Sequence, residues 1–349
     1  MEVSARRILF AAEFWDGSVG AGLAEGFSKC GHYVEKIDFR DYFNRFGRTI
    51  PGRIANRLSF KGGILAYNRA VTDAAERCSP DLFVTVKGSY LSEKTISVLH
   101  EAGTFRLNYY PDVSFDHPGL SLAALKRYDL IATTKSFQLP WLKQNIGAGH
   151  TAFLHHGFSD RIHVPTDVPG ADSEFDWDIC YVGNPSPYKC DWLVGICNAF
   201  PQARIAIAGH GWNKQKHGLS GAELLPAVIA GDFARLLSRS KINLGIHYGP
   251  HGPFDWEDKV STRTFEIPAC QGFMLHIEND EVRSLFETGR EIDMFATPAQ
   301  LNERIAYYLA NPDERMAIAK AGYERAVPAY GLHARAREML AIVEAHAND

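Results

Sequence analysis

The sequence predicts an α/β protein with two Rossmann-like domains, each built on a parallel sheet. Short apolar runs of strand length alternate with amphipathic stretches of helix length along most of the chain, which is typical of parallel sheets covered by helices. At 349 residues the chain is long enough for two domains of ordinary size. Arg161 to Phe175 is rich in proline, glycine and acids and lacks apolar periodicity, which indicates a linker and places the boundary near Thr166.

The first domain, residues 1–165, begins with an apolar run and repeats the strand–helix pattern. The predicted strands are Arg7–Glu13, Tyr33–Asp38, Asp81–Val86, Phe105–Tyr109, Asp129–Thr133 and Thr151–Leu154. The predicted helices are one that ends at Lys29, then Leu65–Arg77, Ser92–Ala102 and Phe137–Gln144.

The second domain, residues 166–330, shows the same alternation. The predicted strands are Asp178–Val182, Arg204–Ala208, Ala227–Ile229, Ile242–His247, Phe273–Ile277 and Glu291–Phe295. The predicted helices are one that starts near Tyr188, Phe233–Ser240 with Asp232 as its cap, one from Ser261 to Cys270, Pro298–Ala310 and Pro312–Ala326. A last helix, Leu332–Ala345, is predicted after this domain.

The segment Lys259–Ile277 predicts a nucleotide site. Ser261 and Thr262 are good N-caps for a short helix whose start is expected at the carboxyl edge of the sheet, where ligands of such sheets bind. Backbone N–H groups there, with Arg263 beside them, suit a phosphate, and Glu266 one turn along suits the two hydroxyls of a ribose. An ordinary capped helix with a surface ion pair explains the same residues without a ligand.

Two further positions in the second domain suit an anionic ligand. Gly183-Asn184-Pro185-Ser186 joins a predicted strand to a predicted helix, and Lys189 follows as a positive point charge. A metal site is not expected, because Gly249 and Pro250 separate His247 from His251 and no cysteine or acid is spaced to complete a ligand set.

Ionisable residues in the first domain are candidates for a catalytic base. Asp112 leaves the carboxyl end of a predicted strand and shares a loop with His117. Glu13 and Asp16 follow the first predicted strand. A turn or helix-cap role explains Asp112 equally well.

Composition excludes several classes of protein. The net charge of −4 argues against a general nucleic-acid binder, and no apolar run has the length of a membrane span. The N-terminal apolar run is too short for a signal peptide, so a cytoplasmic location is expected. The segment Arg40–Lys61 interleaves basic and apolar residues, which predicts either a peripheral membrane contact at the inner face or simply a solvated basic surface.

Several segments in order resemble one known family. Three motifs, in this order, resemble the C-terminal half of the CgeB-like (spore-maturation-type) glycosyltransferases of the GT-B superfamily. They are S-x-R-x-F-E-x-P-A-C-x-G-F, LFETGREI and NPDERMAIAKAGYERA. The resemblance covers roughly Ser173 to Leu340 well and the N-terminal half more loosely.

The resemblance implies a fold and a set of donor contacts. It implies two Rossmann-like domains that face each other across a cleft, with a terminal helix, residues 331–349, that crosses back to the first domain. The candidate donor-binding residues are Gly183, Asn184, Lys189, Gly209, His247, Ser261, Thr262, Arg263 and Glu266. Many retaining members of the superfamily carry two glutamates with seven residues between them, whereas here Asp258 stands at the first of these positions.

The leading hypothesis is a metal-independent glycosyltransferase that uses a nucleoside-diphosphate sugar, with UDP implied by the resemblance. The acceptor would be a glycan, a lipid-linked molecule or a protein, no other cofactor is expected, and Glu266 favours retention of configuration. Inversion would require one of the candidate bases Asp112, Glu13 and His117. The alternatives are a binding protein without turnover and a nucleotide-sugar epimerase on the same scaffold.

Overall fold

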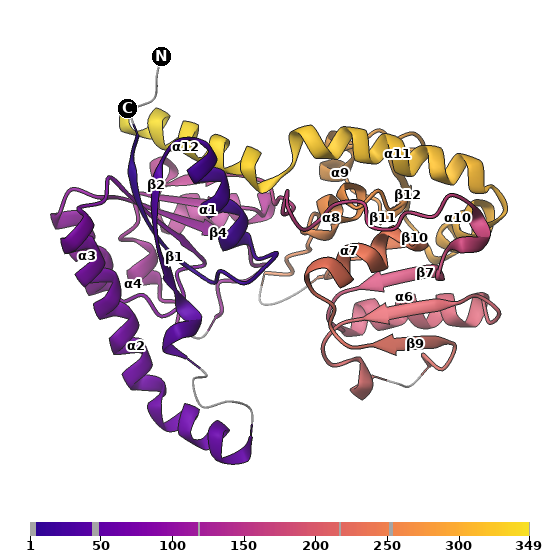
Figure 1. Cartoon of the computed structure of the whole chain (residues 1–349), viewed down its shortest axis with the longest axis horizontal. Coiled ribbons are helices and arrows are strands. Elements are labelled where there is room, and N and C mark those ends of the chain that lie inside the picture. Colours follow the sequence, from indigo (N-terminus) through magenta and orange to yellow (C-terminus); the bar gives the residue numbers. More distant parts are fainter. Residues whose placement is uncertain (1–4, 44–48, 118, 216–217, 251–253, 349) are drawn as a thin grey trace. The chain divides into compact units, whose positions relative to one another are not determined.

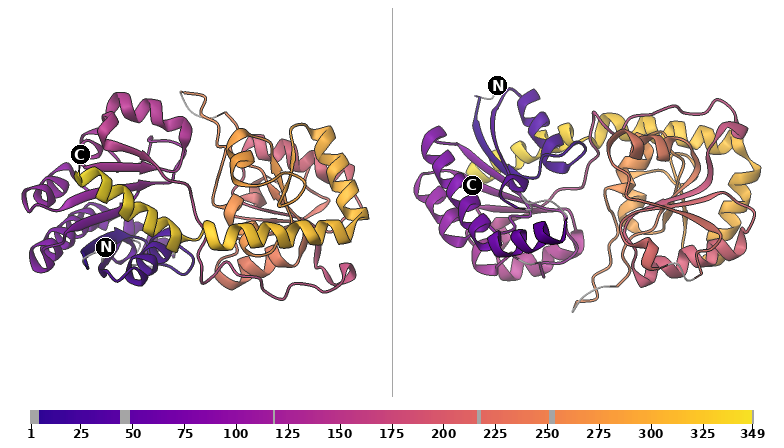
Figure 2. Two further views of the ribbon diagram at one scale, coloured as in Figure 1. Left: turned by 90° about the horizontal axis from the view of Figure 1, so that it is seen from above. Right: turned by 60° about the horizontal axis from the view of Figure 1, so that its bottom comes forward.

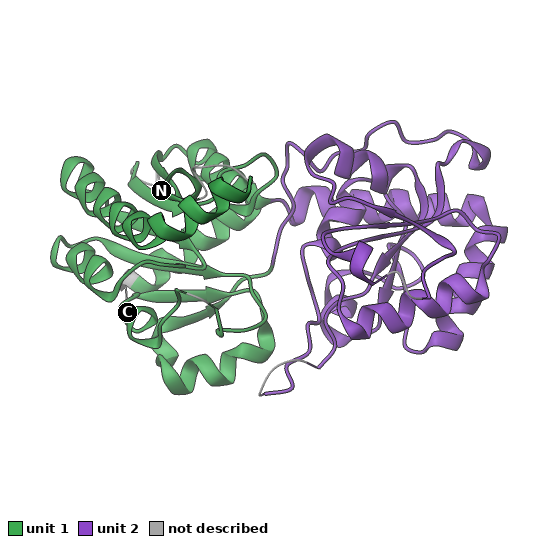
Figure 3. Ribbon diagram, turned by 90° about the horizontal axis from the view of Figure 1, so that it is seen from below, with its two compact units in different colours: residues 1–155, 332–349 green, residues 156–331 purple. Residues whose placement is uncertain are grey.

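The computed structural model describes residues 5–43, 49–117, 119–215, 218–250 and 254–348. The chain forms two compact units, residues 1–155 with 332–349 and residues 156–331 (Figure 3). Each unit contains a six-stranded parallel sheet covered by helices on both faces (Figures 1 and 2). The predicted fold class, two Rossmann-like α/β units, is therefore confirmed.

The sheet of unit 1 has the order β2-β1-β3-β4-β5-β6. Its strands are β1 Arg7–Ala12, β2 Tyr33–Asp38, β3 Leu82–Val86, β4 Phe105–Tyr110, β5 Leu130–Thr133 and β6 Thr151–Phe153. Its helices are α1 Val19–Lys29, α2 Ile50–Cys78, α3 Glu93–Glu101, α4 Leu122–Leu125, α5 Leu139–Asn145 and α12 Leu332–Asn348, with short 3-10 turns η1 Phe39–Tyr42, η2 Ser136–Gln138 and η3 Ala148–His150. The strand order reverses between β1 and β3.

Helix α2 corrects one sequence prediction. Its 29 residues form one helix that begins at Ile50, whereas the sequence placed a helix start at Leu65. Pro51 lies in the first turn, where the missing N–H has no partner in any helix, and the Thr49 side chain accepts from the Gly52 amide. Gly63 is needed farther along, because a Cβ there would lie 2.5 Å from the carbonyl oxygen of Tyr42.

The chain returns to unit 1 through α12, as predicted. Gly22 and Gly26 on α1 leave room for this helix, since a Cβ at Gly22 would lie 2.4 Å from Leu332 and one at Gly26 would lie 2.7 Å from Ala336. Buried side chains of α12, including Met339, pack in the same core as the strands of unit 1.

The sheet of unit 2 has the order β12-β11-β10-β7-β8-β9. Its strands are β7 Trp177–Val182, β8 Ile205–Ala208, β9 Ala222–Leu225, β10 Ser240–Gly245, β11 Met274–Ile277 and β12 Asp293–Phe295. Its helices are α6 Pro187–Ala199, α7 Ala230–Ser238, α8 Arg263–Ala269, α9 Asp280–Leu285, α10 Pro298–Ala310 and α11 Pro312–Ala329, with 3-10 turns η4 Asp172–Glu174 and η5 Trp212–Lys214. Here the order reverses between β7 and β10.

The edge of this sheet differs from the prediction. Residues 222–225 form β9 in place of the predicted strand Ala227–Ile229, because Pro226 lacks the N–H needed to continue the ladder with β8. Helix α7 accordingly starts at Ala230, and Asp232 lies in its first turn and does not cap it.

The expected linker is part of unit 2. Phe158 is buried in the core of that unit and bridges to Gly331. Asp172 forms ion pairs with Lys241 and Arg315. The chain therefore passes between units at 155/156 and 331/332, and the first crossing precedes the boundary expected at 165/166.

Candidate functional site

Parallel sheets bind ligands at the carboxyl ends of their strands, where the strand order reverses. In unit 2 this position lies between β7 and β10. The loops that follow these two strands, together with the start of α8, carry most of the candidate donor-binding residues.

The loops after β7 and β8 are held together by close backbone packing. The carbonyl oxygen of Gly183 accepts a hydrogen bond from the indole of Trp212 at 2.7 Å. Gly209 has φ +152°, and a Cβ at this position would lie 2.2 Å from the Gly183 oxygen, so only glycine fits. The Asn184 side chain accepts from the amide of His210 at 3.1 Å. The structure thus brings Gly183, Asn184 and Gly209 together.

Lys189, the point charge expected from the sequence, is a buried cation in the first turn of α6. It is 5% exposed. Its ammonium donates to the carbonyl of Asn184 at 3.2 Å and lies 3.5 Å from the centre of the Tyr248 ring. Burial lowers the pKa of Lys189 to about 8, with Arg263 lowering it further and Asp258 opposing the shift.

Arg263 and Glu266 form an ion pair on one face of α8. The guanidinium of Arg263 also donates to the carbonyl of Val182 at 3.0 Å and lies over the ring of Phe233. The Arg263 side chain is 29% exposed, whereas that of Glu266 is 9% exposed. On its other side the Glu266 carboxylate lies 3.8 Å from the ring of His163, whose pKa is lowered chiefly by burial.

The start of α8 corrects the expectation of free backbone donors. The amide of Arg263 donates to the Ser261 side chain, and the amide of Thr264 donates to the Ser261 carbonyl. Thr262 is the capping residue by position, but its side chain accepts no capping hydrogen bond. Because these amides already have partners inside the chain, the side chain of Arg263 is the accessible positive group here.

His247 belongs to a buried polar cluster behind these residues. Its Nε2 lies 2.8 Å from Nε2 of His276 and 3.2 Å from the hydroxyl of Thr264. Burial lowers the pKa of His276 to about 4. The cluster therefore joins the ends of β10 and β11 to α8 and stabilises the base of the site. Thr264 and His276 were missed from sequence, because neither stands in a recognisable motif.

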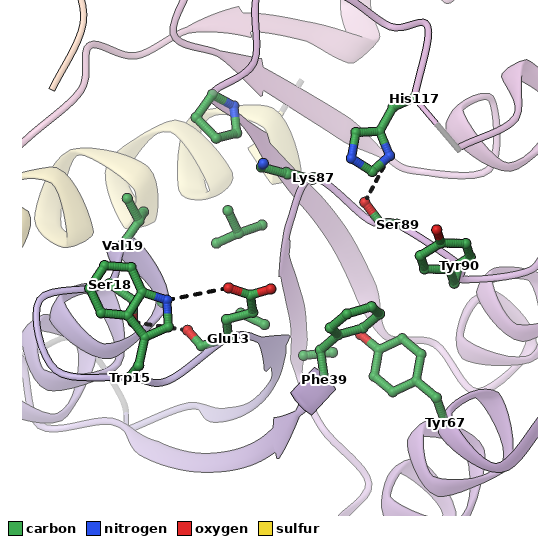
Figure 4. A pocket seen from close by; sticks show the side chains of 15 residues that line it. Glu13, Trp15, Ser18, Val19, Phe39, Tyr67, Lys87, Ser89, Tyr90 and His117 are labelled. Atoms are coloured by element: carbon green, nitrogen blue, oxygen red, sulfur yellow. Dashed lines mark hydrogen bonds between the residues drawn. The ribbon is translucent and has the colours of Figure 1, made fainter. Parts of the chain in front are cut away.

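A cavity of about 430 Å³ lies at the equivalent position in unit 1, between the ends of β1 and β3 (Figure 4). Its lining includes the aromatic side chains of Trp15, Phe39, Tyr67 and Tyr90. The sequence did not identify this aromatic lining, because the four residues come from different elements.

Two of the three predicted catalytic candidates, Glu13 and His117, line the same cavity (Figure 4). Glu13 lines it and accepts a hydrogen bond from the Trp15 indole at 3.3 Å. His117 lines it too, with its ring 3.5 Å from the Ser89 hydroxyl. Asp112 forms an ion pair at 2.9 Å with Lys87, another lining residue.

Lys87 is a functional candidate that was not predicted from the sequence. It has φ +69°, an uncommon conformation for a residue with a side chain. The turn is fixed because the Lys87 amide donates to the Tyr109 carbonyl and the Asn108 side chain donates to the Lys87 carbonyl. Backbone strain of this kind is concentrated at binding sites, which fits its place in the cavity wall.

Two negative findings concern the described residues. Among them, no group of three or more histidine, cysteine, aspartate or glutamate side chains is placed to hold a metal ion, and His251 lies outside them. Within the same described ranges, no helix has both the length and the apolar composition needed to cross a membrane.

Comparison with known proteins shows similarity to glycosyltransferases. A family model described as "Glycosyl transferase-like" matches residues 191–341. No curated protein sequence matches the chain.

The fold is similar to that of several solved structures. The chain is 14% identical to HepE from Anabaena, a structure in complex with UDP, with a TM-score of 0.60 and coverage of 97% of this chain and 100% of that one. It is 14% identical to sucrose-phosphate synthase from Thermosynechococcus elongatus, with a TM-score of 0.67 and coverage of 97% and 98%. It is 12% identical to a glycosyltransferase from Rickettsia africae, with a TM-score of 0.64 and coverage of 99% and 100%. These likenesses concern the fold alone.

The buried His276 predicts acid sensitivity. Its pKa of about 4 lies below the unfolded value of 6.5, so the unfolded state binds more protons between these values and stability falls as the pH falls through this window. The loss contributed by one such group is about 1.4 kcal/mol per pH unit. The check is the free energy of unfolding in urea, measured at pH 7 and at pH 5. Between these pH values the decrease in this free energy should be about 2 kcal/mol smaller for His276→Gln than for the wild type. The exposed His100→Gln is the control, and equal losses in both variants would contradict the prediction.

Proposed function

We propose that this chain is a glycosyltransferase of the GT-B type and that it transfers a sugar from a UDP-sugar to an acceptor hydroxyl, which its fold and the partial family match support. One observation carries the proposal. Lys189, Arg263 and Glu266 converge at the switch point of unit 2, where two cations suit a diphosphate and one carboxylate suits a ribose. The UDP bound to Anabaena HepE supports the choice of uridine, and the order of the segments in the sequence supports the CgeB-like branch.

The donor would bind by exchanging partners with groups that are already paired. Arg263 is partly exposed and would rotate its free edge toward the diphosphate, while its Nε keeps the hydrogen bond to Val182. Glu266 would then accept hydrogen bonds from the ribose hydroxyls in place of the guanidinium. His163 on the far side of Glu266 limits the directions that the carboxylate can face.

Departure of UDP requires stabilisation of the charge that grows on the diphosphate. Preorganised positive groups in a site of low dielectric supply such stabilisation without a reorganisation cost. Lys189 meets this condition, because a carbonyl and an aromatic ring hold its ammonium in a buried position. With Arg263 beside it, we propose that no metal ion is required.

The acceptor would bind the aromatic cavity of unit 1. Aromatic faces such as Trp15 and Tyr90 suit the apolar faces of sugar rings, and the polar lining suits their hydroxyls. The acceptor is therefore a glycan or the glycan part of a lipid-linked molecule or protein. Glu266 and its context favour retention, and Glu13, Asp112 and His117 are the base candidates for an inverting reaction.

Binding of uridine and of UDP tests separately whether Glu266 binds the ribose and whether Arg263 binds the diphosphate. Glu266→Gln should weaken both ligands, because both contain the ribose, whereas Arg263→Gln should weaken UDP and leave uridine unchanged. A hydrogen bond to a charged group contributes about 1.5–3 kcal/mol, so each loss should be about 10- to 150-fold in Kd by isothermal titration calorimetry.

The exposed pair Arg290 and Glu287 has the same i,i+3 spacing and provides the matched control, Arg290→Gln. If Glu266 only neutralises Arg263, then Glu266→Gln will bind UDP as well as the wild type or better, and the ribose role is wrong.

Lys189 predicts a pH dependence of donor binding. With a pKa of about 8 in the free protein, its ammonium loses its proton as the pH rises through this value, and affinity for UDP should fall. Binding of the anion should raise this pKa, so about half a proton should be taken up per UDP bound at pH 8. Calorimetry in two buffers of different ionisation enthalpy measures the uptake. Lys189→Met should abolish the proton uptake. If the uptake persists in this variant, the proton binds to another group.

A transfer assay with UDP-sugars and oligosaccharide acceptors tests the reaction itself. We expect full activity in EDTA, because Lys189 and Arg263 supply the positive charge, and an α-linked product from an α-linked donor by proton NMR. Complete loss of activity in EDTA would show that a metal is required, and a β-linked product would show inversion. Conversion of the donor without any acceptor would instead identify an epimerase.

A further inference from the structure

The first half of α2 has an apolar surface that the fold of unit 1 does not use. Ile50, Ile54, Leu58 and Leu65 are 76%, 56%, 82% and 73% exposed. At 100° per residue these four positions lie within about 80° of one another around the helix axis, so they share one side of the helix. We call these four residues the α2 stripe.

A different face of α2 packs on unit 1. Tyr67, Val71, Ala74 and Ala75 are buried, and Phe60 contacts the rings of Phe43 and Tyr90. The α2 stripe is therefore not the core-facing side of an amphipathic helix. Figure 1 shows the first turns of α2 extending beyond the sheet of unit 1, which leaves this part of the helix accessible.

Positive side chains adjoin the stripe: by the same helical geometry Arg53 and Arg57 lie on one flank of it, and Lys61 lies within its arc, between Leu58 and Leu65 along the helix. Arg53, Arg57 and Lys61 recur at every fourth position and are exposed, and none of the three forms an ion pair with any residue that the structure describes. The neighbouring arginines differ, because Arg40 pairs with Asp38 and Arg69 pairs with Asp73.

The charge pattern points to one kind of partner. No aspartate or glutamate occurs between Asp41 and Asp73, although the whole chain has a net charge of −4. A narrow row of aliphatic side chains beside long basic side chains suits the boundary between acyl chains and anionic headgroups, where the stems of arginine and lysine lie along apolar surface and their charges reach phosphate.

We propose that the first half of α2 docks on an anionic lipid bilayer, with the α2 stripe inserted among the acyl chains and Arg53, Arg57 and Lys61 on lipid phosphates. This surface spans residues 50–65 and therefore overlaps only part of the segment Arg40–Lys61 that the sequence suggested. Arg40 is neutralised within the fold, and Arg45 and Arg48 lie outside the described residues. Docking needs neither donor nor acceptor, so it is independent of the proposed reaction.

Sedimentation with vesicles tests the proposal. The full chain should bind vesicles of phosphatidylcholine with 30% phosphatidylglycerol, less so at 500 mM than at 50 mM salt, and should bind pure phosphatidylcholine weakly. Each basic residue near an anionic surface contributes about 1 kcal/mol, so Arg53→Gln with Arg57→Gln and Lys61→Gln should lower the partition coefficient on the order of a hundredfold. Ile54→Asn with Leu58→Asn should lower it at least tenfold on the same vesicles.

Matched controls lie on unit 2. Val327→Asn changes an exposed apolar residue of a helix, and Arg290→Gln with Lys320→Gln removes exposed positive charges, so both should bind as the wild type does. Thermal unfolding confirms that each variant is folded. No binding of the wild type to anionic vesicles at 50 mM salt, or equal binding by the α2 variants, would overturn the proposal. A concentration-dependent dimer that Ile54→Asn with Leu58→Asn abolishes would assign the stripe to a second copy of the chain instead.

Discussion

Parallel strand pairing is the constraint on which the rest of this molecule depends. It brings the carboxyl ends of all strands in a unit to one edge of the sheet, and the reversal of strand order opens a position where two loops diverge. In unit 2 the loops after β7 and β10 carry Asn184, Tyr248 and Asp258 to this position. In unit 1 the ends of β1 and β3 form the wall of the aromatic cavity by the same rule.

The charged groups at the site of unit 2 are held in place by partners within the unit when no ligand is bound. An isolated charge in the interior is costly, so each cation and carboxylate has a partner within the unit. Lys189 is held by a carbonyl and an aromatic ring, and Arg263 by a carbonyl and Glu266. A nucleoside-diphosphate sugar would therefore replace contacts that already exist within the unit. The free energy of binding is then the difference between the contacts made with the ligand and the contacts that it replaces.

Helix α2 serves two roles because its two faces meet different surroundings. Tyr67 and its buried neighbours anchor the second half of the helix to the sheet, and Tyr67 also contributes to the cavity wall. Among the residues that the structure describes, the first half has no comparable cover, and its exposed aliphatic row lies beside positive charges that form no ion pair with any of them. A single long helix thus connects a candidate acceptor cavity to a surface suited to lipid headgroups.

The alternation of apolar runs and amphipathic stretches was sufficient to predict the fold class, because hydrophobic periodicity is a local property of the chain. The spacing of Arg263 and Glu266 was also readable, since residues three apart on a helix share a face. Tertiary structure alone decided the burial of Lys189, the contact of His163 with Glu266 and the turn at Lys87, because each depends on residues brought together from distant segments. It also decided the length of α2 and the pairing of the α8 amides. A proline or a cap residue permits several local conformations, and packing against the rest of the unit selects one of them.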